Sequence, residues 1–299
     1  PLIISTTYES PSGESEDAEF QVFYPPHLYL SSSIGNGNMA FGLGLFSPFG
    51  IGGRAWDEDG LTRYGATRSE IATLSINPAF SWQAFPSISM GAGINYMKAI
   101  TRASKMMDQS IFAAGDGAFD LDGDGDGFGY NLGALVHHDK YRIGLAYRSG
   151  VKVDIEGTAK LDNIAPPLQP LFGGSEFETA ASTTLDFPEI WSIGIAYMPA
   201  GSVVLDIDLE WIMWSSFDQM DLDLADEVPL AGFTDSSTEK EWKDVLTVKA
   251  GIEYRISPGF SLRGGYAYVE TPVPEHTLDP GHPDSVQHNF STGFGYSVR

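Results

Sequence analysis

The stretch that decides the fold is IATLSINPAFSWQAFPSISMGAGINYMKA, residues 71–99. Alternation splits it into two strands with a tight turn at residues 83–87, because successive side chains of a strand point to opposite faces. The bulky side chains share one face, and they are Leu74, Ile76, Pro78, Phe80, Trp82, Ile88, Met90, Ala92, Ile94 and Tyr96. The other face carries Ser, Asn, Ala and Gly, which suits a crowded or water-filled interior. This pattern is typical of a transmembrane β-barrel hairpin.

Composition narrows the class of protein. The 299 residues suffice for one large barrel or about two ordinary domains. No run approaches the ~18 apolar residues of a membrane helix, whereas barrel strands need only ~9–11 alternating residues. A net charge of −23 argues against nucleic-acid binding, and the lack of cysteine excludes disulfides, thiolate metal sites and cysteine nucleophiles. Because the chain starts at Pro1 without a signal peptide, we expect a mature or truncated piece.

The same alternation recurs along the chain and predicts one antiparallel β-barrel domain over residues 1–299. About twelve strands are expected: two in residues 71–99, and one each in 1–9, 27–33, 38–46, 128–136, 141–161, 185–198, 203–214, 245–256, 259–270 and 286–298. We expect residues 100–127 to form an excursion, with a short amphipathic helix at best followed by an acidic loop. Residues 162–182 and 218–243 are expected as further loops. Short turns at one end and long loops at the other are the asymmetry of an outer-membrane barrel.

Five stretches carry a resemblance to a known family. They are LSINPAFSWQ (74–83), GYNLGALVHHDKYRIGLAYRSGVKVDIEG (129–157), FPEIWSIGIAY (187–197), DLEWIMWSSF (208–217) and WKDVLTVKAGIEYRISPGFSLRGGYAYVETPVP (242–274). In these stretches and their order, the chain resembles the outer-membrane long-chain fatty-acid and hydrophobic-compound transporters of the FadL/TodX (OMPP1) type. The resemblance implies a fourteen-stranded transmembrane barrel in the bacterial outer membrane, with an N-terminal hatch plugging the lumen. Since neither a hatch nor two last strands are found, we expect a fragment, monomeric and surrounded by outer-membrane lipid and lipopolysaccharide.

The segment Ser47-Pro48-Phe49-Gly50 interrupts the strand over residues 38–46. Proline cannot donate to the strand ladder and glycine weakens it, so a kink or bulge is expected here. The resemblance implies that an inward kink of the third strand opens a gap in the wall, through which a hydrophobic ligand leaves sideways into the membrane. An ordinary bulge at the barrel rim is the alternative interpretation.

Several side chains are candidates for binding a ligand in the lumen. Arg148 is an inward cation suited to pairing with a fatty-acid carboxylate, and Lys249 and Arg263 share its orientation. Ion pairs with lumen acids such as Asp206, Asp208 and Glu210 are the alternative. The apolar candidates for the pocket are Phe46, Phe49 and Trp214.

Metal and catalytic motifs are weak. Asp120, Asp122, Asp124 and Asp126 alternate like the start of a calcium loop, but its twelfth position is Asn131 instead of the bidentate glutamate. We therefore expect a surface loop that binds calcium weakly or not at all, and no metal site. No catalytic constellation stands out, so we predict no enzyme and no cofactor.

The sequence thus predicts passive uptake of long-chain fatty acids or aromatic hydrocarbons, with lateral release through the kinked strand. The alternative is a structural, adhesive or cation-binding outer-membrane barrel without transport. A porin for polar solutes is a third possibility.

Overall fold

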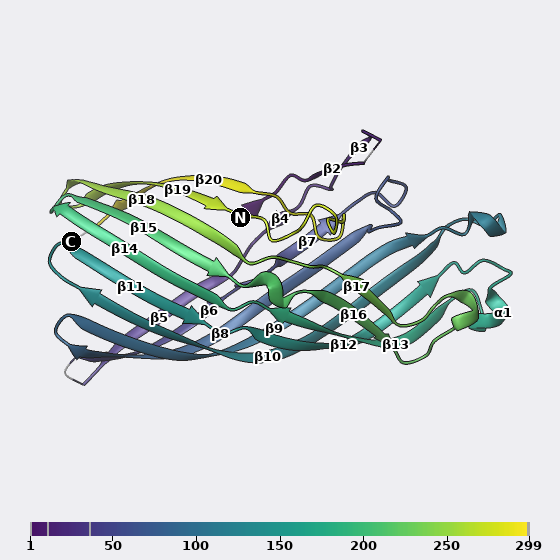
Figure 1. Ribbon diagram of the computed structural model, residues 1–299, viewed down its shortest axis with the longest axis horizontal. Helices are drawn as coiled ribbons and strands as arrows, with labels where there is room; N and C mark the ends of the chain where they lie inside the picture. Colours follow the sequence, from purple (N-terminus) through teal and green to yellow (C-terminus); the bar gives the residue numbers. More distant parts are fainter. Residues whose placement is uncertain (1, 11, 36, 298–299) are drawn as a thin grey trace.

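The computed structural model describes residues 2–10, 12–35 and 37–297, and strands dominate it (Figure 1). One antiparallel sheet forms a long curved wall in which neighbours are hydrogen-bonded. Its eleven wall strands are, in spatial order, β5 (His27–Ile34), β6 (Met39–Phe46), β8 (Arg68–Phe85), β9 (Ile88–Met107), β10 (Gly117–His137), β11 (Tyr141–Arg148), β14 (Ile190–Ala200), β15 (Val203–Ile212), β18 (Val245–Ser257), β19 (Phe260–Val269) and β20 (Gln287–Tyr296). Within the described residues, β5 pairs only with β6 and β20 pairs only with β19.

The wall forks at β10. The half of β10 near the short turns pairs with β11, and its other half pairs with β12. An extension of the sheet therefore continues beyond the wall on the side of the long loops (Figure 1). It contains β7 (Ile51–Ala55), β12 (Val151–Asp162), β13 (Phe177–Phe187), β16 (Gln219–Leu224) and β17 (Ser236–Glu239).

The remaining elements are short. Four lie in the N-terminal segment, as the pairs β1 (Leu2–Ile3) with β4 (Val22–Phe23) and β2 (Thr7–Glu9) with β3 (Ser15–Asp17). The helical turns are η1 (Ser110–Phe112), α1 (Gln169–Phe172), η2 (Trp214–Ser216) and η3 (Pro229–Ala231). No helix in the described part of the chain is long and apolar enough to cross a membrane.

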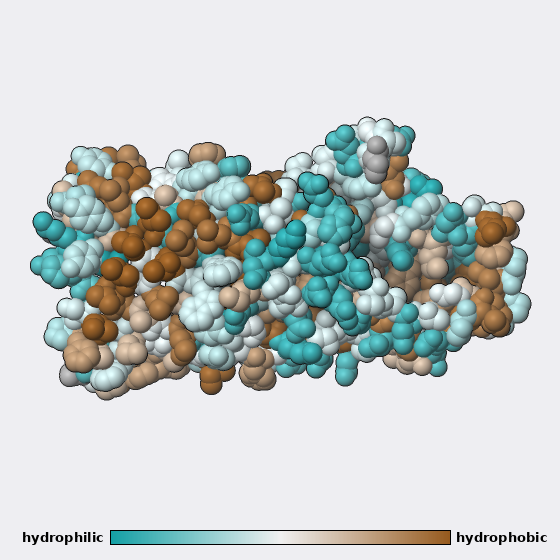
Figure 2. Space-filling view, viewed as in Figure 1, coloured by the Kyte–Doolittle hydropathy of each residue, from teal (hydrophilic) through white to brown (hydrophobic). Residues whose placement is uncertain are grey.

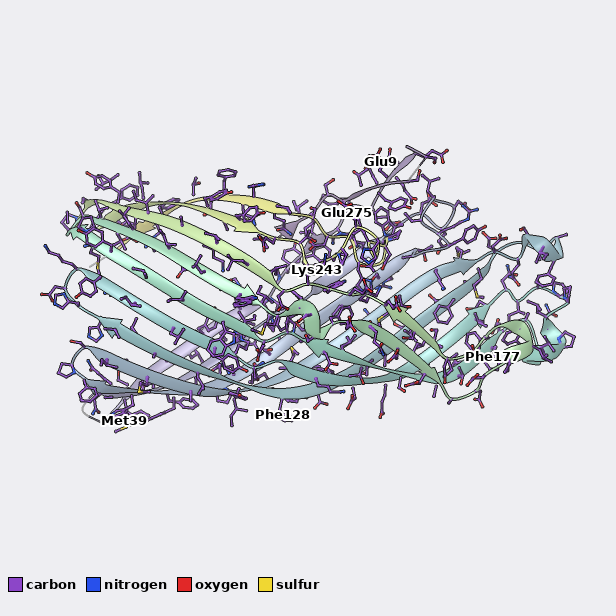
Figure 3. All side chains as sticks on the ribbon, viewed as in Figure 1. Glu9, Met39, Phe128, Phe177, Lys243 and Glu275 are labelled. Atoms are coloured by element: carbon purple, nitrogen blue, oxygen red, sulfur yellow. The ribbon has the colours of Figure 1, made fainter. Side chains whose placement is uncertain are left out.

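The outward face of the wall changes character along β10. Its outward side chains are Asp120, Asp122, Asp124 and Asp126 in the extension, and Phe128, Tyr130 and Leu132 in the wall. Phe128 projects away from the sheet in Figure 3, and its ring lies 5.2 Å from that of Tyr96 on β9. Aromatic rings at such a change are typical of a membrane–water boundary. Apolar side chains accordingly gather at the short-turn half of the molecule in Figure 2, with hydrophilic ones over its middle.

The inward face changes in the opposite sense. In the wall it carries small and polar residues, whereas in the extension it is apolar, as on β12 with Val151, Val153 and Ile155. These residues belong to a buried cluster that fills the inside of the sheet where the wall meets the extension. Its members are Phe49, Met97, Ala99, Val151, Val153, Ile155, Leu185, Phe187 and Phe217. We call this the upper cluster, and it lies on the long-loop side of the lumen.

The structure confirms the β-barrel class and the hairpin at 71–99, whose strands are longer than expected. It corrects several boundaries. Residues 2–9 form no wall strand, which leaves eleven wall strands among the described residues rather than about twelve. The excursion at 100–127 is mostly strand, because β9 runs to Met107 and β10 begins at Gly117. The strand expected at 141–161 is two strands, since β11 ends before Ser149 and Gly150 and β12 begins after them.

The expected loop at 218–243 contains β16, η3 and β17. The expected loop at 162–182 ends earlier, because residues 177–187 form β13, and the strand expected at 185–198 is β14, which begins at Ile190. The expected strand at 286–298 is present as β20, and residue 298 lies outside the described residues.

Candidate functional site

The interruption predicted at Ser47–Gly50 is present as a bulge between β6 and β7. The register passes from Phe46 opposite Ser75 to Ile51 opposite Ala72, so four residues stand opposite two on β8. Within the described structure, residues 47–50 have no register partner on β8. Gly50 has φ +57°, and a Cβ there would lie 2.2 Å from the carbonyl oxygen of Ile71, so this position requires glycine.

Side-chain hydrogen bonds hold the bulge where the ladder is missing. Thr73 on β8 makes most of them: its Oγ1 accepts from Phe49 N–H at 3.2 Å and donates to the carbonyl oxygen of Phe49. The backbone N–H of Thr73 donates to the carbonyl oxygen of Gly50 at 3.2 Å, and the carbonyl oxygen of Thr73 accepts from Ser47 Oγ at 2.5 Å. The bulge is therefore a defined structure rather than a disordered break.

The bulge carries Phe49 into the upper cluster. Its ring is 9% exposed, stacks on Phe187 with centroids 5.2 Å apart, and meets Trp214 edge to face at 5.7 Å. Trp214 in turn lies 5.0 Å from Trp242. The sequence-predicted residues Phe49 and Trp214 are thus brought together, in an aromatic stack that reaches toward the long loops.

Beneath this stack the lumen holds two adjoining cavities of about 480 and 600 Å³. Arg148 lines the first, together with Asn131, Ser192 and Glu210. The guanidinium of Arg148 lies over the ring of Phe46 at 4.8 Å, and no ion pair involving Arg148 is found within the described part of the chain. A half-buried cation on an aromatic ring, facing a cavity, is suited to an anionic group on an apolar ligand.

The other two predicted cations have carboxylate partners. Lys249 Nζ lies 2.5 Å from Glu210 Oε2, and Arg263 Nε lies 2.7 Å from Glu253 Oε2. Both pairs face the lumen, as the alternative interpretation anticipated. The structure therefore sets Arg148 apart from Lys249 and Arg263, because it faces the cavity without such a partner in the described chain.

The surface loop expected at Asp120–Asp126 is not found, because these residues lie on strand β10 with their side chains outward. Three of them have partners on β9: Asp124 pairs with Lys98, Asp122 with Arg102 at 3.1 Å, and Asp120 accepts from Ser104 at 2.6 Å. No group of three or more His, Cys, Asp or Glu side chains with metal-binding geometry occurs among the described residues. The stripe is a charged outer surface.

Comparison with known proteins agrees with this geometry. The family model described as "Outer membrane protein transport protein (OMPP1/FadL/TodX)" matches residues 4–299. The chain belongs to this family. Members of the FadL/TodX family are outer-membrane β-barrels that transport hydrophobic compounds, so this chain is an outer-membrane protein. Its relatives are transport proteins rather than enzymes.

Individual relatives are distant in sequence and similar in fold. The long-chain fatty acid transport protein of Escherichia coli O6:H1 is 25% identical, over 99% of this chain and 72% of its own length. A Pseudomonas aeruginosa FadL homologue of known structure aligns with a TM-score of 0.81 at 22% identity, over 96% of this chain and 67% of its own. The P. putida toluene transporter TodX aligns with a TM-score of 0.76 at 18% identity, over 99% and 77%.

Sequence reasoning missed three residues of the site: Thr73, Phe187 and Ile190. Thr73 was identifiable only as an inward residue, because its partner depends on the two extra residues in the bulge. Ile190 lines the first cavity and packs against the upper cluster, so the cluster forms a boundary of that cavity.

Proposed function

We propose that this chain takes up hydrophobic small molecules passively across the outer membrane and releases them sideways at the bulge of residues 47–50. The observation that carries the proposal is the position of the bulge. It interrupts the ladder of the wall immediately after Phe46, the residue whose ring covers Arg148 at the cavity. A ligand in the cavity is therefore next to the stretch where, in the described structure, the pairing of β6 and β7 with β8 is interrupted.

The level of the bulge also supports lateral release. Leu74, which stands opposite the bulge, is the cross-strand partner of Lys98, and two residues further along Ile76 pairs with Tyr96. Lys98 pairs with Asp124 on the charged outer surface, whereas Tyr96 belongs to the aromatic boundary. An opening at residues 47–50 would thus face the membrane at the boundary near the long loops.

The cavity favours ligands with a long apolar body. Its inward lining is mostly small, with residues such as Gly91, Gly133 and Ala146 beside Ile190, and Arg148 supplies a cation at one end. Long-chain fatty acids fit both features, and aromatic hydrocarbons fit the apolar part alone. These two classes also appear in the names of the relatives. We further propose that the protein acts as a monomer surrounded by outer-membrane lipid and lipopolysaccharide.

Uptake of a labelled long-chain fatty acid and of toluene, in cells with and without the protein, tests the proposal. The protein should accelerate entry of at least one of them, and equal entry after deletion would refute it. Calcium-dependent cell adhesion without uptake would instead favour the structural or adhesive alternative.

Arg148→Met separates the two ligand classes. It should slow uptake of the fatty acid by about tenfold, since a charge-assisted hydrogen bond contributes about 1.5–3 kcal/mol, and should leave toluene uptake unchanged. Arg68→Met is the matched control, because Arg68 pairs with Glu70 on the extension, away from the cavity. Equal effects of Arg148→Met on both ligands would contradict the role of Arg148 as the carboxylate partner.

A further inference from the structure

We infer that Phe49 is a stopper that closes the path between the lumen and the bulge, and that the hydroxyl of Thr73 is the latch that keeps it closed. Thr73 is a positioning residue, since it acts through Phe49. The inference rests on the proposed lateral release and adds a residue that sets how often the release path opens.

The stopper is placed by its contacts. Phe49 lies in the upper cluster against Phe187 and Trp214, and Ile190 connects that cluster to the cavity. A molecule that passes from the cavity to the gap at residues 47–50 must therefore move the Phe49 ring. The ring contacts Phe187 and Trp214, and each such aromatic pair adds only a little to the stability of the fold, so displacement of the ring is feasible.

The latch is placed by hydrogen bonds. The N–H and the C=O of Phe49 both bond to Thr73 Oγ1, and Thr73 is 5% exposed. Neither group has a ladder partner, because the register has no pair between Phe46 and Ile51. A buried peptide without a partner is costly, so the hydroxyl favours the conformation in which Phe49 points into the cluster.

Loss of the hydroxyl should shift this balance toward the open conformation. In Thr73→Val the shape of the side chain is retained, but the two peptide groups of Phe49 lose their partner. Thr73→Ser retains the hydroxyl. Thr183→Val is the matched control: Thr183 is also buried, lies on β13 beside Leu185, and its hydroxyl has no hydrogen-bond partner among the described residues.

Two measurements on the whole protein test the inference. The rate of amide hydrogen exchange at Phe49 reports directly on its hydrogen bond to Thr73 Oγ1. In Thr73→Val it should be at least about fivefold faster than in the unmodified protein, whereas Thr73→Ser and Thr183→Val should stay within about twofold. Uptake of fatty acid or toluene reads the stopper. It should be faster in Thr73→Val, and faster in Phe49→Ala, which removes the ring and keeps the latch residue.

The outcomes separate the possible errors. Unchanged exchange in Thr73→Val would overturn the latch. Faster exchange with unchanged or slower uptake would overturn the stopper, and so would slower uptake in Phe49→Ala if Thr73→Val does not fold. Absence of uptake by the unmodified protein would overturn the proposed function and this inference together, whereas normal uptake with no effect of these variants would overturn the inference alone.

Discussion

Replacement of Gly50 by alanine should destabilise the protein through the bulge. At φ +57° a residue with a Cβ costs about 1–2 kcal/mol relative to glycine. The new Cβ would also lie 2.2 Å from the Ile71 oxygen, so the backbone must shift away from β8. That shift would break the hydrogen bond from Thr73 N–H to the Gly50 oxygen, worth about 0.5–1.5 kcal/mol. The free energy of unfolding should therefore fall by roughly 2–3 kcal/mol.

Gly173→Ala separates the two contributions. Gly173 follows α1 at φ +80°, but no atom lies within 4 Å of its Cβ position, so only the conformational cost of about 1–2 kcal/mol applies. Urea unfolding of both variants in the same lipid or detergent should show the larger loss for Gly50→Ala. Equal losses would refute the reasoning, because they would mean that the bulge can move away from β8 at no cost.

Two further predictions concern the loops and the wall. Burial by itself raises the pKa of the Asp279 carboxyl, but His282 and Lys240 outweigh it and hold that pKa well below its usual range. The carboxylate therefore stabilises the 270–286 loop at neutral pH. This stabilisation should decline as the pH falls below about 4, seen as faster limited proteolysis of the loop, and Asp279→Asn should remove the pH dependence. On the outward face of the wall, Ile193→Arg should cost about 2–4 kcal/mol of folding free energy in lipid. Ser182→Arg, on the charged outer surface, should cost about 0–1 kcal/mol. Similar costs would contradict a membrane–water boundary between these two positions.

Alternation predicts the membrane part of the wall well. The hairpins at 71–99 and 245–270 are found as expected, because lipid on one side and a narrow lumen on the other impose different residues on successive positions. The same reasoning fails in the extension, where water lies outside and the apolar cluster lies inside.

The acidic stretch of β10 shows why. Asp and Gly are depleted in strands, so residues 120–127 indicate a loop by propensity. Their strand conformation is stabilised by partners that only the register supplies, such as Arg102 for Asp122. On the inner side, a Cβ at Gly123 would lie 2.7 Å from Ile155 Cγ2 and 3.1 Å from the Glu156 oxygen, so the close pairing with β12 favours glycine there. Tertiary pairing thus overrides local preference.

The site divides in the same way. The bulge is predictable from Pro48 and Gly50, whose effects on a ladder are local. The hydrogen bonds of Thr73 are not predictable, because they depend on how β6, the bulge and β7 are aligned with β8. The difference between Arg148 and Lys249 also depends on neighbours: the register places Asp208 opposite Lys249 and Glu210 diagonally from it, within reach of its ammonium group.

The lumen on the short-turn side of Arg148 gives an electrostatic reason for the proposed lateral route. Asp206, Asp208 and Glu210 follow one another on the inward face of β15, level with residues 142–146 of β11 and therefore closer to the short turns than Arg148. Lys249 compensates Glu210, but a fatty-acid carboxylate that continued down the lumen would pass Asp206 and Asp208, which line the second cavity together with the cation Arg142. Like charges in a narrow space repel. Leaving at the bulge keeps the carboxylate beside Arg148 while the apolar chain enters the membrane. The order of charges along the lumen would thus favour sideways release of an anionic ligand. It would have no such effect on an uncharged hydrocarbon.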